Sequence, residues 1–107
     1  MNNLTQKRCV PCEGGIDPIK LGEAKKLLAQ LKGWKLVSNK KLKKEFHFIN
    51  FKHTMDFVNR IAILAETEKH HPDMVISYAN LKIELFTHAI NGLSENDFIL
   101  AAKIDQL

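Results

Sequence analysis

The sequence has no apolar run close to the roughly 18–20 residues that a transmembrane helix needs. Its first ten residues, MNNLTQKRCV, contain no apolar segment of the kind that a secretory signal carries. Arginine occurs only at Arg8 and Arg60, and no nucleic-acid-binding motif is present. We therefore expect a cytoplasmic protein that has neither a membrane nor a nucleic acid as its partner.

Length and charge add little to these exclusions. A chain of 107 residues with a 45% hydrophobic fraction suits one domain, 1–107, with a modest single core. The formal net charge of +4 comes from 16 basic and 12 acidic residues. Two clusters hold much of the basic surplus: Lys40, Lys41, Lys43, Lys44 and Lys20, Lys25, Lys26, Lys32. Because acidic residues are scattered between them, a solvated surface is a better interpretation than an anion-binding stripe.

Periodicity predicts alternating helices and hairpins after an irregular arm at residues 1–16. The predicted elements are a helix at 18–32, a hairpin from 34–38 and 42–50, a helix at 53–69, a second hairpin within 74–88, and a helix at 95–106. The order α-β-β-α-β-β-α predicts an α+β fold of two layers, in which helices cover one face of a four-stranded antiparallel sheet. Lys44 interrupts the apolar alternation of the second strand.

Local signals place several of the element boundaries. Asp17-Pro18 forms a good cap and first-turn pair for the first helix. Ala79-Asn80 is a plausible two-residue turn for the second hairpin. Ser94 with Asp97 resembles a capping box at the start of the last helix.

The two cysteines, Cys9 and Cys12, have C-x-x-C spacing in the N-terminal arm. A zinc site normally needs two more protein ligands, and the sequence has no second cysteine pair. A thioredoxin-like motif should open a helix after a strand, which this arm does not. We favour a structural turn closed by Gly14-Gly15, while a metal shared with another subunit stays open as an alternative.

The five histidines do not form an H-x-x-x-H pair, which would place two metal ligands on one helical face. His47 and His53 flank a strand-to-helix junction and are expected on the surface. A mononuclear site from His70 or His71 with His88 is possible, but no carboxylate ligands are arranged around it. Acid-base catalysis is therefore favoured over metal catalysis, and we predict no metal site.

The stretch TEKHHPDM places two histidines where the helical pattern stops. Pro72 restricts His71 to extended conformations, so the helix should end near Lys69 or His70. Consecutive helical side chains diverge by about 100°, and the bend gives each imidazole a direction of its own. A simple alternative is that the pair caps the helix, where a cation favours the C-terminal dipole. A third histidine, His88, lies at a predicted strand end that could meet this helix exit in one pocket.

A family resemblance rests on EKHHPD, on the aromatic Tyr78, and on THAINGLSENDFILAAKID. These segments resemble the signature of pterin-4a-carbinolamine dehydratases, including the spacing from His71 to His88. LKGWKL and the CVPCEGG arm are similar to bacterial and plant members, so the resemblance covers nearly the whole chain.

The resemblance implies a lyase that dehydrates 4a-hydroxytetrahydropterin to quinonoid dihydropterin. This substrate is the adduct that an aromatic amino acid hydroxylase leaves on its pterin cofactor. No metal or organic cofactor is required. Our hypothesis is that His71 and His88 exchange protons with the substrate, while His70 binds and orients it. The catalytic and substrate-binding positions implied by the family are His70, His71, Pro72, Thr87, His88, Ala89 and Ile90, with Glu66 and Asp97 nearby.

The same resemblance implies a homodimer or homotetramer, formed through a second hairpin at the sheet edge. The sequence departs from animal members at Lys69, where they carry an acid, and at Met74, where they carry tryptophan. Animal members also bind a homeodomain transcription factor, and nothing in this sequence extends that role to it. The alternatives are a non-enzymatic interaction or regulatory module on the same fold, including one that uses Cys9 and Cys12 through a metal or a thiol.

Overall fold

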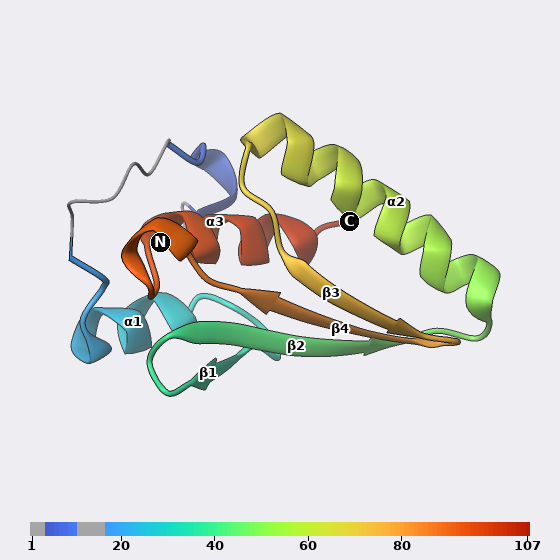
Figure 1. Ribbon diagram of the computed structural model, residues 1–107, viewed down its shortest axis with the longest axis horizontal. Helices are drawn as coiled ribbons and strands as arrows, with labels where there is room; N and C mark the ends of the chain where they lie inside the picture. The colour runs from blue at the N-terminus through green and yellow to red at the C-terminus, as the bar shows by residue number, and fades with distance from the viewer. Residues whose placement is uncertain (1–3, 11–16) are drawn as a thin grey trace.

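The computed structural model describes residues 4–10 and 17–107, which form helices packed against one four-stranded antiparallel sheet (Figure 1). The elements are, in chain order, the 3₁₀ turn η1 (Leu4–Gln6), α1 (Leu21–Leu28), β1 (Lys35–Val37), β2 (Lys41–His47), α2 (Phe51–Glu68), β3 (Asp73–Ser77), β4 (Asn80–Leu85), the 3₁₀ turn η2 (His88–Ile90) and α3 (Glu95–Ile104). The α+β class and the order α-β-β-α-β-β-α are confirmed. No described helix is long and apolar enough to cross a membrane.

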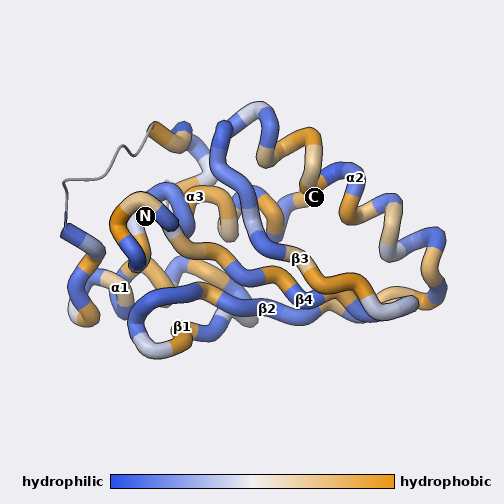
Figure 2. The backbone as a smooth tube through the Cα atoms, viewed as in Figure 1, coloured by the Kyte–Doolittle hydropathy of each residue, from blue (hydrophilic) through white to orange (hydrophobic). Residues whose placement is uncertain are grey.

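The strand order is β1-β2-β4-β3, so the two hairpins meet in the middle of the sheet. In the central pair, Leu42 lies opposite Leu85 and Phe46 opposite Leu81. Leu81, Ile83 and Leu85 alternate along β4, and each is fully buried. They join one apolar core with the inner faces of α2 and α3, and Figure 2 shows the hydrophobic stretches that supply it.

Lys44 lies on the inner side of β2 because its ammonium group finds partners there. Its Nζ is 2.8 Å from Asp105 Oδ1 and donates to the carbonyl of Lys32 at 2.8 Å. It also lies over the rings of Trp34 and Phe46. The residue that interrupts the sequence pattern therefore has its charge paired and its stem packed on aromatic rings.

The first helix begins later and ends earlier than the predicted span of 18–32. The backbone N–H of Ile19 donates to Leu93 O at 2.8 Å, which ties this residue to the loop before α3. Lys20 is the N-cap and uses no side-chain hydrogen bond, so the predicted Asp17-Pro18 cap was wrong. After Leu28 the chain continues in turns up to Gly33.

The predicted turn of the second hairpin was wrong by one residue. Ser77 pairs with Asn80, which makes Tyr78-Ala79 the two-residue turn. Tyr78 adopts a positive φ of 51°, the conformation that primed hairpin turns require at their first position. The pairing register outweighs the local preference of Asn80 for this conformation, because it keeps the apolar side chains of β4 on the core face.

Candidate active site

The helix exit reverses the chain at Lys69. This residue takes the left-handed conformation with φ of 55°, and His70 N–H donates to Ala65 O to close the last turn. Pro72 follows in extended backbone, and β3 begins at Asp73. The predicted end of the helix near Lys69 is confirmed. Neighbouring histidines consequently leave the exit in different directions and find different partners.

A pocket of about 290 Å³ opens beside this exit. Its walls come from the exit itself, from the end of β4 with the start of η2, and from the N-terminal arm. The lining residues are 69–73, 86–89, Val10 and Asn96. His70, His71 and His88 all line it, so the structure brings together the three histidines that sequence reasoning singled out.

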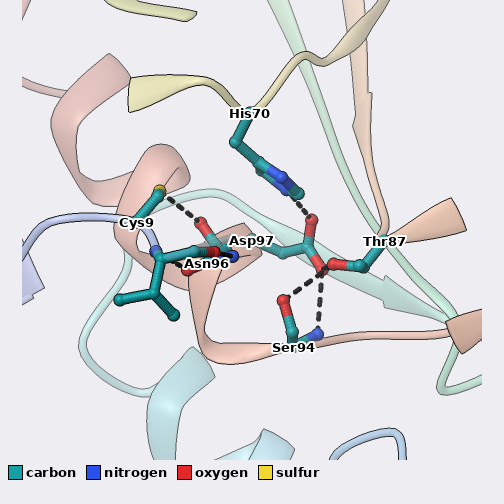
Figure 3. A network of polar contacts seen from close by, with 7 residues as sticks. Cys9, His70, Thr87, Ser94, Asn96 and Asp97 are labelled. Carbon is teal, nitrogen blue, oxygen red and sulfur yellow. Dashed lines mark hydrogen bonds and ion pairs between the residues drawn. The ribbon is translucent and has the colours of Figure 1, made fainter. Parts of the chain in front are cut away.

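His70 forms a buried pair with Asp97. Its Nε2 is 2.6 Å from Asp97 Oδ1, and the two side chains are 12% and 0% exposed (Figure 3). The other carboxylate oxygen accepts from Thr87 Oγ1 at 2.8 Å and from the backbone N–H of Ser94 at 3.0 Å. The last contact belongs to the predicted capping box at the start of α3. Both oxygens of this buried carboxylate therefore have partners, which fixes the ring of His70.

His71 forms a pair of the same length in a different environment. Its Nε2 is 2.6 Å from Glu66 Oε2, but these side chains are 60% and 79% exposed. An ion pair this exposed contributes little free energy, because water screens it and competes for both partners. The imidazole of His71 is therefore accessible to solvent and only weakly held by Glu66.

His88 is the first residue of η2 and presents an exposed ring at the pocket. Its ring centroid is 4.1 Å from that of Phe86. A bridge between Thr87 and Gly92 closes the loop that carries it. A Cβ on Gly92 would lie 2.8 Å from the Cβ of Pro18, so only glycine permits this close approach. The glycine in T-H-x-x-x-G thus helps to position the histidine.

The remaining predicted site residues lie at different distances from the pocket. Pro72, Thr87 and Ala89 line it, whereas Ile90 is not among its lining residues. Glu66 and Asp97 contact the histidines from outside the lining. His47 and His53 are exposed, as expected, and contact the side chains of Asn80 and Asn50 away from the pocket.

Val10 and Asn96 also line the pocket, and no pattern in the sequence predicts this. Val10 belongs to an arm with no periodicity, and its contact with Asn96 joins residues 86 positions apart. Asn96 lies inside the THAINGLSENDF segment, but its role depends on the arm.

Cys9 is the one cysteine within the described residues, since Cys12 and Gly14-Gly15 lie outside them. Burial, reinforced by the nearby Glu68 carboxylate, raises the pKa of the Cys9 thiol to about 12. At neutral pH this thiol is protonated, and a protonated thiol is a poor nucleophile and metal ligand. Among residues 4–10 and 17–107, no group of three or more metal-ligating side chains comes together.

Comparison with known proteins extends the sequence resemblance. The family model described as "Pterin 4 alpha carbinolamine dehydratase" matches residues 17–107. The chain belongs to this family. It is therefore a member of a family of dehydratases, and the N-terminal arm lies outside the matched region.

Two curated relatives are named "Putative pterin-4-alpha-carbinolamine dehydratase". The one from Nitrosomonas europaea is 53% identical, with 98% of this chain and 93% of that protein covered. The one from Rubrobacter xylanophilus is 47% identical over the full length of both chains.

Solved structures of dehydratase-like proteins have the same fold. A "transcriptional coactivator/pterin dehydratase" from Brucella melitensis matches with a TM-score of 0.79 and 28% identity, over 84% of this chain and 97% of that one. A "pterin dehydratase-like protein", described as a RuBisCO assembly factor in the α-carboxysome, matches with a TM-score of 0.59 and 24% identity, over 69% and 87%. The second likeness concerns the fold alone.

Proposed function

We propose that the protein dehydrates 4a-hydroxytetrahydropterin to quinonoid dihydropterin and so returns the pterin cofactor of an aromatic amino acid hydroxylase. The observation that carries this proposal is the meeting of His70, His71 and His88 in one pocket. Family membership supports the reaction class. The names of the Rubrobacter and Nitrosomonas relatives support the substrate.

The reaction needs one acid and one base. The carbon–oxygen bond at the carbinolamine carbon breaks, and the departing hydroxyl takes a proton to leave as water. A ring N–H gives up its proton, and the electron pair of that bond forms the new C=N bond. Nothing is oxidised or reduced overall. Histidine suits both steps because it titrates near neutral pH.

The proposed roles follow the environments of the three rings. His71 and His88 are the acid-base pair, because both are exposed at the pocket and can be re-protonated from solvent. His70 binds and orients the substrate, because Asp97 holds its ring in place. The substrate-contacting positions are His70, His71, Pro72, Thr87, His88, Ala89 and Ile90, with Glu66 and Asp97 behind the histidines.

The proposal includes a homodimer or homotetramer in the cytoplasm. The edge strand β3 exposes Val75 at 56% and Ile76 at 39%. An unpaired edge with apolar side chains supports pairing with a second copy.

The direct test is a stopped-flow assay in which a hydroxylase generates the carbinolamine and the purified protein is then added. We expect its decay to accelerate in proportion to protein concentration. Decay that stays at the buffer rate over the same range would refute the proposed reaction.

The second candidate is a non-enzymatic interaction module on the same fold. The Brucella relative is described as a coactivator as well as a dehydratase, which favours this alternative over others. A folded, oligomeric protein without turnover in the stopped-flow assay would support it. A metal-linked regulator would instead require stoichiometric zinc that is lost in Cys9→Ser.

A further inference from the structure

Two hydrogen bonds to one side chain hold the N-terminal arm beside the pocket. The backbone N–H of Val10 donates to Asn96 Oδ1 at 2.9 Å, and Asn96 Nδ2 donates to Val10 O at 2.6 Å. Asn96 is 5% exposed. The side-chain amide of Asn96 therefore bonds the backbone of one residue through both its oxygen and its nitrogen. This makes it a specific clamp.

A second attachment lies one residue earlier. The backbone N–H of Cys9 donates to Glu68 Oε1 at 2.9 Å, while Lys103 Nζ lies 2.6 Å from Glu68 Oε2. The side chains of Glu68 and Lys103 are 8% and 16% exposed. Burial alone would raise the pKa of Glu68, but the hydrogen bonds from Lys103 and Cys9 hold it below its usual value. This carboxylate is therefore charged at neutral pH and keeps its acceptors available to the arm.

Both attachment points are next to the buried His70–Asp97 pair. Glu68 is the last residue of α2, two positions before His70, and Asn96 immediately precedes Asp97. The arm therefore connects the chain segment that supplies His70 with the segment that supplies Asp97. Val10 lines the pocket next to these attachments, and the residue is 66% exposed.

We propose that Val10 is an apolar rim of the substrate site, and that Asn96 and Glu68 are positioning residues that hold it there. This inference rests on the proposed function and extends the site beyond the region that the family model matches. A flat pterin ring entering the pocket would pack one edge against Val10 while His70, His71 and His88 contact its reacting atoms. The arm then controls how tightly substrate binds, and the histidines control how fast it reacts.

The test compares three alanine variants in steady-state dehydration of enzymatically generated carbinolamine. Asn96→Ala releases the clamp without changing charge, and we expect KM to rise about tenfold with kcat within about threefold. Val10→Ala leaves the backbone clamp intact, and we expect KM to rise about threefold. Glu95→Ala is the matched control, because within residues 4–10 of the arm Glu95 contacts Lys7 through an exposed ion pair. Its KM should stay within about twofold of the unaltered value.

The double variant distinguishes positioning from general structural support. If Asn96 acts through Val10, Val10→Ala should add little to Asn96→Ala, giving a total near tenfold rather than about thirtyfold. Unchanged KM in both single variants would overturn the inference, as would a kcat that falls with the melting temperature while KM is constant. Absence of turnover in the unaltered protein would instead refute the proposed function, and the inference with it.

Discussion

His70 and His71 are adjacent in sequence and each contacts a carboxylate at 2.6 Å, yet the two pairs have opposite environments. The His70–Asp97 pair is buried, and every oxygen of its carboxylate has a partner. The His71–Glu66 pair lies in solvent. The same contact therefore holds one ring in place and restrains the other only weakly. A histidine–carboxylate distance alone does not define a role, because burial decides whether the pair orients a ring or only touches it.

The largest effect should follow removal of the buried carboxylate. Asp97→Ala removes the acceptor of the Ser94 N–H and the carboxylate partner of the His70 ring, and it leaves the buried Thr87 hydroxyl with Ser94 Oγ as its contact. We expect a loss of about 3 kcal/mol in the free energy of unfolding. Urea denaturation followed by circular dichroism measures it. A loss under about 1 kcal/mol would mean that water or a rearranged partner replaces the carboxylate.

Loss of the proposed proton carriers should reduce rate rather than stability. His71→Ala and His88→Ala are each expected to lower kcat about hundredfold, the usual contribution of one general acid or base. Both side chains are exposed, so the melting temperature should hardly change. His47→Ala is the control, since His47 is an exposed histidine away from the pocket. The acid-base assignment fails if both single variants keep the unaltered rate.

Glu68 is a buried carboxylate paired with the ammonium group of Lys103, so its substitution tests how much this pairing stabilises the fold. Because the folded protein holds its pKa below the usual 4.5, its stabilising contribution is complete above that pH and is lost as pH falls through the folded pKa. At pH 7 we expect Glu68→Gln to be about 1–2 kcal/mol less stable than the unaltered protein. This difference in the free energy of unfolding should become smaller at acidic pH, below the usual pKa range of carboxyl groups. Parallel urea titrations from neutral to acidic pH measure it, and a constant gap would contradict the account.

The smallest effect should come from the exposed pair. Glu66→Gln removes a charge that is 79% exposed, so stability should change by less than about 0.5 kcal/mol. Turnover should change by less than about threefold if His71 does not depend on this contact for its orientation. A rate as low as that of His71→Ala would show that the exposed carboxylate also positions its ring, and the contrast between the two pairs would disappear.

Much of the fold could be predicted because its signals are local. The end of α2 near Lys69 follows from Pro72 in the stretch EKHHP, and the capping contact of Asp97 follows from its spacing to Ser94. The turn at Tyr78 could not be located, because the pairing register of β3 with β4 overrides the local preference of Asn80. The start of α1 at Leu21 could not be located either, and the preceding Ile19 contacts Leu93, which is distant in sequence.

The candidate site, like the fold, has features that local sequence signals predict and features that depend on distant contacts. Three histidines and their pocket could be anticipated from a motif, but not which of them is buried. The burial of His70 follows from Asp97, 27 residues later, and the Val10 rim depends on Asn96. Such contacts leave no periodicity in the sequence. The structure also explains the position of Lys69. Its left-handed backbone ends α2, and the residue lines the pocket without belonging to either histidine–carboxylate pair.

The central claim is that the exposed histidines of this pocket transfer the protons of a pterin dehydration. The most direct measurement is the stopped-flow decay of the carbinolamine with equal concentrations of the unaltered protein and of a His71→Ala/His88→Ala double variant. We expect a rate proportional to concentration for the unaltered protein and a rate near that of buffer for the double variant. Equal acceleration by both proteins, or by neither, would contradict it.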